Sequence, residues 1–221
     1  MNRKKVLAAI RILEESYGVH EARQTDPVDL LVMTILSQNT SDTNSLRAFA
    51  LLQSRFCGYE EVLSAPEEAV ADSICTGGLA DMKARRIKET LVRIKQDAGC
   101  ISLGFLAGMK KEEAMAYLLS LPGVGPKTAS VVLLFAFAMP FLPVDTHVYR
   151  LSRRLGLVEE GVRPEKAQAI LERIVPADKY LSLHLNLIRH GRLVCRARAP
   201  RHEQCGLKSC CDYFLQGKSL K

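Results

Sequence analysis

The stretch Leu121-Pro122-Gly123-Val124-Gly125-Pro126-Lys127-Thr128 decides the fold of this chain. The residues before it, 112–120, and those after it, up to Phe137, read as helices that its prolines and glycines interrupt. Glycine adopts positive φ without steric cost and brings backbone N–H groups close to a ligand, and the second helix presents its positively polarised end. The stretch therefore predicts a helix-hairpin-helix suited to a phosphate. An ordinary tight connection between two packed helices is the alternative.

Apolar residues recur at helical spacing along most of the chain, for example Val6, Ile10 and Leu13. Residues 131–134 are apolar enough for a buried strand, but the surrounding window is rich in alanine and lacks hairpin turn signals. A helix is the better interpretation there. No internal repeat, low-complexity tract or long Gly/Ser linker occurs in the sequence. We therefore expect an all-α protein with closely packed lobes.

Composition and charge narrow the class of protein. The 221 residues are 48% hydrophobic and 25% charged, which excludes a disordered chain, collagen and a disulfide mini-scaffold. No apolar run approaches the roughly 20 residues that cross a bilayer, so we expect a cytoplasmic protein without a membrane partner. Residues 189–221 hold eight Lys or Arg and two acidic residues, and thus carry +6 of the net charge of +7. This distribution predicts an anionic polymer as the partner, with a solvated basic tail as the alternative.

A lysine and an aspartate accompany the hairpin motif. Lys127 follows the turn directly, and Asp145 lies 18 residues later, in Pro143-Val144-Asp145-Thr146-His147-Val148-Tyr149-Arg150. Together the two segments resemble the signature of endonuclease III type DNA glycosylases, a helix-hairpin-helix family with a Gly/Pro-rich loop and an aspartate. The resemblance covers nearly the whole chain and implies that Lys127 and Asp145 are the catalytic pair. Taken singly, Lys127 would be a phosphate contact and Asp145 a helix N-cap.

The residue types at these positions determine the chemistry that the resemblance implies. A lysine amine can attack the sugar C1′ and form a Schiff base, which permits elimination of the 3′ phosphate, whereas a hydroxyl cannot form that imine. Family members that only remove a base have Ser or Tyr in place of the lysine, so Lys127 implies lyase activity as well. The carboxylate of Asp145 would stabilise the cationic sugar as the glycosidic bond breaks and assist proton transfer.

The same resemblance implies which residues open the duplex, because chemistry at C1′ requires the nucleotide to leave the stack. A polar side chain, usually Gln, fills the gap in the family. The ungapped match places Asn39 there, with Gln38 one residue earlier. Leu79 is the candidate for an apolar wedge. The alternatives are a local cap at Gln38 or Asn39 and a core position for Leu79. The other residues expected to contact DNA are Gly123, Val124, Gly125, Thr128, Arg196, Arg198 and Arg201.

Four of the seven cysteines cluster near the end of the sequence, which without a secretion signal favours a metal site over disulfides. The pattern Cys195-x6-His202-x2-Cys205-x5-Cys211 resembles the family's Cys-x6-Cys-x2-Cys-x5-Cys loop with one ligand changed. It implies a structural [4Fe-4S] cluster with His202 as the fourth ligand, which would hold the Arg-rich loop against DNA. Three alternatives stay open: Cys210 is the fourth ligand, one iron lacks a protein ligand, or the metal is zinc.

The remaining cysteines and two of the histidines lack ligand spacing. We expect Cys57, Cys75 and Cys100 to be small buried residues. We expect His184 and His190 to be ordinary packed or surface histidines.

The resemblance completes the expected architecture and function. Residues 26–140 should form a six-helix barrel that carries the helix-hairpin-helix. Residues 1–25 and 141–221 should form a second lobe with the iron-sulfur loop 195–211, and DNA should lie across the cleft between the lobes. The implied enzyme is a monomer that removes a damaged base, an oxidised pyrimidine, from double-stranded DNA and cleaves the strand at the abasic site. A uracil or thymine mismatch glycosylase and a non-catalytic DNA-binding module are the rivals.

Overall fold

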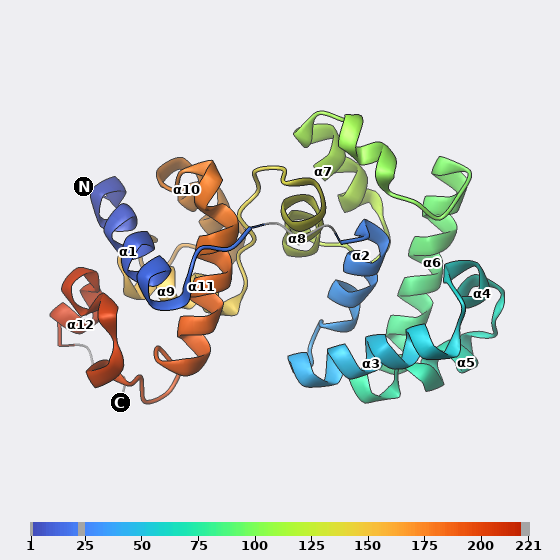
Figure 1. Ribbon diagram of the computed structural model, residues 1–221, viewed down its shortest axis with the longest axis horizontal. Coiled ribbons are helices and arrows are strands. Elements are labelled where there is room, and N and C mark those ends of the chain that lie inside the picture. Colours follow the sequence, from blue (N-terminus) through green and yellow to red (C-terminus); the bar gives the residue numbers. More distant parts are fainter. Residues whose placement is uncertain (1, 22–24, 218–221) are drawn as a thin grey trace. The chain divides into compact units, whose positions relative to one another are not determined.

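The computed structural model describes residues 2–21 and 25–217, and every regular element in these ranges is a helix (Figure 1). The prediction of an all-α fold is therefore confirmed. The chain divides into two compact units. Unit 1 contains Met1–Arg23 and Ala138–Lys221, and unit 2 contains Gln24–Phe137.

Unit 2 is built around α2. Its elements are α2 (Pro27–Leu36), α3 (Asp42–Arg55), α4 (Tyr59–Ser64), α5 (Glu67–Ser73), η1 (Cys75–Gly77), α6 (Ala80–Ala98), η2 (Gly104–Gly108), α7 (Lys111–Ser120) and α8 (Pro126–Phe137). Because α2 packs against both α6 and α8, its Leu31, Ile35 and Leu36 have no exposed surface (Figure 1). Burial of one such side chain contributes about 1.5–3 kcal/mol. This core fixes the ends of the loops that follow α2 and precede α6 and α8.

Unit 1 joins the two ends of the chain. Its elements are α1 (Asn2–Tyr17), α9 (Thr146–Arg154), α10 (Pro164–Ile174), η3 (Ala177–Lys179), α11 (Tyr180–Leu193), η4 (His202–Gln204), η5 (Gly206–Cys210) and α12 (Asp212–Leu215). The predicted apolar face of α1, with Val6, Ile10 and Leu13, is buried, and α1 packs on α11 and η5. Lys5 Nζ also donates to Asp212 Oδ1 at 2.5 Å. The first helix is thus part of the same packed unit as the cysteine-rich segment.

The sequence predictions for residues 131–134 and for the three scattered cysteines have different outcomes. Residues 131–134 lie within α8, as predicted. The prediction that Cys57, Cys75 and Cys100 are buried is wrong, because all three are exposed. Each lies in or beside a connection between helices, so none occupies an apolar helix face. Within residues 2–21 and 25–217, no helix combines the length and the apolar character needed to span a membrane.

Candidate functional site

The hairpin between α7 and α8 is anchored by two apolar residues. Leu121 and Val124 are buried, and Val124 N–H donates to Leu121 O at 3.2 Å. Gly123 has φ +73°, a conformation that favours glycine, and a Cβ at this position would lie only 2.8 Å from Cδ of Arg86, whose side chain would then have to move. The positively polarised end of α8 begins next to the turn, at Pro126. A rigid glycine turn beside a helix N-terminus is an arrangement that can bind a phosphate group.

The loop after α2 separates two neighbouring polar residues. Gln38 is half-buried, its Nε2 donates to Gly123 O at 3.2 Å, and its Oε1 accepts from Arg86 Nη1 at 3.2 Å. Asn39 is exposed and has φ +54°. The N-cap of α3 is Ser41, so neither residue has the capping role considered as an alternative. Gln38 therefore fixes this loop to the hairpin, and Asn39 stands at the surface.

Leu79 occupies an unusual position between η1 and α6. Its side chain is 55% exposed, so it is not a core residue. Its backbone also lies in the left-handed region, with φ +52°, and it follows Gly78, which has φ +71°. A bulky residue with an apolar side chain in solvent and a strained backbone is a feature that usually serves a function.

The predicted catalytic residues begin helices in different units. Lys127 is an exposed residue in the first turn of α8. The next residue, Thr128, is buried, so little of it is accessible to DNA. Asp145 is half-buried and is the N-cap of α9, where its Oδ1 accepts from Val148 N–H at 2.7 Å. This capping role is compatible with catalysis because a carboxylate has a second oxygen and further lone pairs.

The thiols of the cysteine-rich loop lie in one neighbourhood. Burial raises the pKa values of Cys205 and Cys211, and the nearby Cys195 raises both further. Cys210 also lies close enough to raise the pKa of Cys205. No three Cys, His, Asp or Glu side chains in the described part of the chain are already arranged around a metal position. The thiol set fits a soft metal or an iron-sulfur cluster by its chemistry, but the ligand geometry is not preformed.

Two imidazoles differ in their relation to this loop. The ring of His202 packs against α12, with centroid distances of 5.2 Å to Phe214 and 6.0 Å to Tyr213. Buried His190 has its Nε2 at 3.5 Å from Cys205 Sγ, and burial lowers its pKa to about 4. His190 is thus a packed histidine, as expected, but it lies against the thiols. The role of His202 as a ligand remains a prediction.

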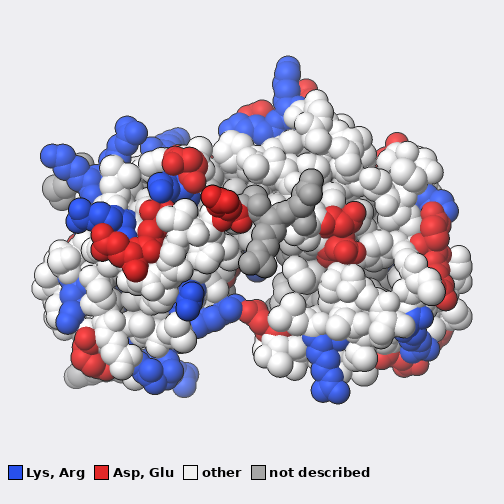
Figure 2. Space-filling view, in the orientation of Figure 1, with Lys and Arg blue, Asp and Glu red and all other residues white. Residues whose placement is uncertain are grey.

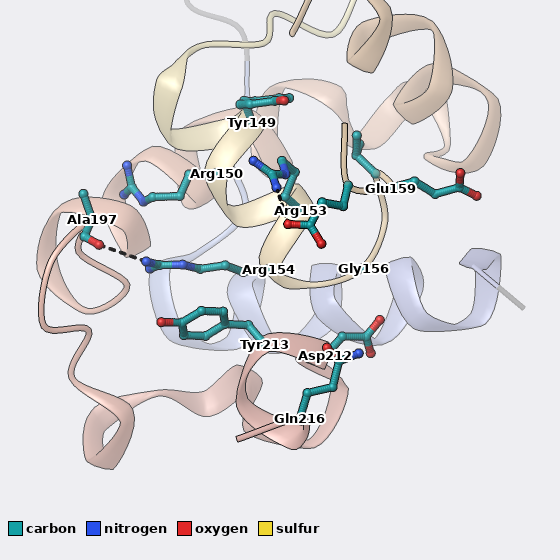
Figure 3. Close-up of a pocket in the computed structure, with 12 residues that line it drawn as sticks. Tyr149, Arg150, Arg153, Arg154, Gly156, Glu159, Ala197, Asp212, Tyr213 and Gln216 are labelled. Atoms are coloured by element: carbon teal, nitrogen blue, oxygen red, sulfur yellow. Dashed lines mark hydrogen bonds and ion pairs between the residues drawn. The ribbon is translucent and has the colours of Figure 1, made fainter. Parts of the chain in front are cut away.

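Two arginines of α9 hold the start of the cysteine-rich loop. Buried Arg154 donates to Ala197 O at 3.0 Å and to Cys195 Sγ at 3.1 Å, and its guanidinium lies 4.7 Å from the centroid of the Tyr213 ring (Figure 3). Arg150 Nη2 donates to Cys195 O at 3.0 Å. Arg150, Arg154, Ala197 and Tyr213 are among the residues that line a pocket of about 740 Å³ within unit 1. Side chains of α9 therefore anchor the loop, whether or not a metal is bound.

The basic residues of this loop are accessible. Arg196, Arg198 and Arg201 are all exposed, as contacts with a nucleic-acid backbone would require. Figure 2 shows cationic and anionic side chains together on the viewed face of each unit. That face therefore does not present one uniform sign of charge.

Three buried polar residues organise these loops, a role that was not predicted for them from the sequence: Lys83, Arg154 and His190. Lys83 lies four residues before Ile87 and eight before Leu91 on the buried stripe of α6, so a lysine in an apolar pattern was the available signal. Arg154 and His190 gave no such signal because their sulfur partners are 41 and 15 residues away in the sequence.

Comparison with known proteins identifies the class that this fold and site define. The model of the HhH-GPD superfamily base excision DNA repair proteins matches residues 32–177. This span contains the hairpin, Lys127 and Asp145. The chain therefore belongs to the HhH-GPD superfamily of base excision DNA repair proteins.

Individual relatives narrow this class. The chain is 35% identical to endonuclease III of Thermotoga maritima, over 87% of this chain and 85% of the relative. It is 37% identical to a candidate DNA glycosylase of Arabidopsis thaliana over 81% of this chain, which spans only 61% of that relative's length. A solved non-covalent endonuclease III–DNA complex has a TM-score of 0.82 with 26% identity, over 97% of each chain. The chain belongs to the endonuclease III family and is a DNA glycosylase and abasic-site lyase of base excision repair.

Proposed function

We propose that Lys127 is the nucleophile of this enzyme and that Asp145 is its carboxylate partner. The observation that carries the proposal is an exposed lysine in the first turn of α8, directly after the glycine turn, in a chain with an aspartate at the start of α9. Nζ of Lys127 attacks C1′ of the displaced nucleotide, and the glycosidic bond breaks with release of the base. Loss of a proton from C2′ of the resulting imine then expels the 3′ phosphate and cuts the strand. The carboxylate of Asp145 stabilises positive charge on the sugar.

Asn39 and Leu79 are assigned the duplex-opening roles. Asn39 is supported over Gln38 because Gln38 is already bound to Gly123 and Arg86, whereas Asn39 is exposed. Leu79 offers an exposed apolar side chain that can enter a base step. Displacement of a damaged base costs less than that of a paired base, which contributes to selectivity.

The proposed substrate is double-stranded DNA with an oxidised pyrimidine, bound by one copy of the chain. A panel of end-labelled duplexes tests this assignment: an oxidised pyrimidine, uracil or thymine opposite guanine, an abasic site, and an undamaged control. We expect release of the oxidised pyrimidine with strand cleavage at the same site, and no cleavage of the undamaged duplex. Faster release of uracil or thymine opposite guanine would instead identify a mismatch glycosylase. Binding without release of any base would identify a non-catalytic module.

A [4Fe-4S] cluster held by Cys195, Cys205, Cys211 and His202 is the second part of the proposal. Support comes from the family spacing and from the proximity of the three thiols, since Cys195 lies close enough to raise the pKa values of Cys205 and Cys211. The Arg154 N–H that reaches Cys195 Sγ would stabilise a thiolate. The cluster, when bound, would cross-link the loop, and no step of the reaction at C1′ uses it.

Metal analysis of anaerobically purified protein tests the ligand set. We expect iron and acid-labile sulfide in equal amounts in the wild-type chain, and loss of both in Cys205→Ser, because one of the thiolate ligands that would hold the cluster is removed. Cys57→Ser is the matched control, since Cys57 is an exposed cysteine outside the loop, and it should keep the wild-type content. His202→Ala should lower the iron content. An unchanged iron content in His202→Ala, together with a loss of iron in Cys210→Ser, would identify Cys210 as the fourth ligand. Zinc without iron in the wild-type protein would overturn the cluster assignment.

A further inference from the structure

We propose that Lys83 is a positioning residue that sets the two duplex-opening loops relative to each other. The inference rests on the function proposed above for Asn39 and Leu79. It adds a residue that does not touch DNA and yet determines where those two side chains stand.

Lys83 has no exposed surface, although it lies in the first turns of α6. Its Nζ donates to Leu36 O at 2.7 Å and to Gly77 O at 2.8 Å, and it forms no ion pair with any described carboxylate. Burial lowers its pKa. Lysine is almost never fully buried without partners, and a buried ammonium cannot contact a phosphate. The common explanation for a lysine in a DNA-binding protein therefore does not apply to Lys83.

The two carbonyls that Lys83 binds stand just before the two proposed DNA-opening residues. Leu36 ends α2 three residues before Asn39, and Gly77 ends η1 two residues before Leu79. Asn39 and Leu79 both have positive φ, of +54° and +52°. Such conformations persist only where the surrounding structure holds them. The ammonium of Lys83 donates a hydrogen bond to each of the two segments. It thereby holds their backbone conformations and fixes the separation of the two loops.

A cation suits these two carbonyls for an electrostatic reason. The last carbonyls of a helix have no partner within the helix and carry its partial negative charge. Leu36 and Gly77 are the last residues of their helices, and both carbonyls are brought to one buried point. An apolar side chain in place of Lys83 would leave both acceptors without their shared donor, at a free-energy cost to this arrangement of the loops.

The same face of α6 also supports the hairpin. Arg86, one turn after Lys83, donates to Gln38 Oε1 at 3.2 Å, and Gln38 in turn binds the hairpin. One further turn along, Thr90 Oγ1 donates to Pro122 O at 2.9 Å. Residues at this spacing line one side of a helix. This side of α6 therefore supports the gap-filling loop, the wedge and the hairpin, and Lys83 is buried on it, as Thr90 is.

The test compares Lys83→Met with Lys88→Met. Lys88 is a matched control because its Nζ also donates to two main-chain carbonyls, but those of Leu63, near the end of α4, and of Ala65, directly after it. On duplex DNA with a damaged base, we expect kcat/KM of Lys83→Met to fall by roughly tenfold to a hundredfold, because a misplaced positioning group has effects of this size. Lys88→Met should stay near the wild-type value.

Two further measurements separate positioning from general loss of structure. Borohydride trapping on a single-stranded abasic oligonucleotide needs no duplex opening, so Lys83→Met should give a near wild-type yield. Fluorescence of 2-aminopurine placed beside the lesion should show less base displacement than with wild type. Equal fluorescence, or an equal loss on single-stranded and duplex DNA, would overturn the proposal. If Lys83→Met does not fold, Lys83→Gln, which keeps a donor, takes its place. A wild-type chain that traps neither substrate would instead contradict the proposed function.

Discussion

In the Lys127→Ala variant, borohydride should trap no covalent adduct with abasic DNA, and strand cleavage should fall by roughly three orders of magnitude or more. The reason is chemical: the imine needs an amine, and alanine removes the atom that forms the new bond to C1′. The lysine side chain is exposed, so its loss should leave the fold intact. The measurement is the yield of the slower-migrating protein–DNA band after reduction, together with the rate of strand cleavage.

Lys166→Ala is a close control for this variant. Lys166 is also an exposed lysine in the first turn of a helix that begins with proline, α10. Its loss removes one positive charge, as the loss of Lys127 does, so a general electrostatic effect on DNA binding should appear in both variants. We expect full trapping by Lys166→Ala. An undiminished adduct in Lys127→Ala would assign the nucleophile to another amine.

The parts of the molecule that were predictable from the sequence depend on local residues. The hairpin follows from two glycines and two prolines between apolar helices, and it forms where these residues predict it. The first turn of α8 and the N-cap at Asp145 likewise depend on neighbours within four residues. Helix periodicity also placed Val6, Ile10 and Leu13 in the core. Short-range sequence patterns contain enough information for features of this kind.

Features that depend on contacts between residues far apart in the sequence could not be predicted from short-range patterns. The sequence did not separate Gln38 from Asn39, because the difference arises from Gly123, 85 residues away from Gln38. Cys57, an exposed residue, was expected to be buried from residue type alone, and its place in a turn decided otherwise. No role was predicted for Lys83, because its partner Leu36 lies 47 residues away. Tertiary hydrogen bonds of this range determine which member of a motif is exposed.

Asp145 illustrates how one side chain can have a structural and a chemical role at the same time. Its Oδ1 accepts from Val148 N–H, which completes the N-terminus of α9. Loss of an N-cap costs about 0.5–2 kcal/mol, so a loss of activity in Asp145→Ala would mix the two roles. A substitution that keeps the cap and removes the charge is needed to separate them.

Asp145→Asn is that substitution, because asparagine is as good an N-cap as aspartate. We expect its activity in base release to fall by roughly 10²–10⁴-fold, since the charge that stabilises the cationic sugar is lost. Its free energy of unfolding should change by less than about 1 kcal/mol, the usual size of the charge–dipole contribution at a helix N-terminus. The measurements are single-turnover rates on a damaged duplex and urea unfolding of the same preparations.

Asp26→Asn provides the matched comparison for this last variant. Asp26 caps α2 in the same way, with its carboxylate accepting from Val28 N–H at 2.8 Å and Asp29 N–H at 3.1 Å. Both variants exchange an N-cap aspartate for asparagine, so they should share any small loss of stability. We expect only Asp145→Asn to lose activity. Equal single-turnover rates in the two variants would show that Asp145 serves only as a helix cap. A different group would then have to stabilise the positive charge on the sugar.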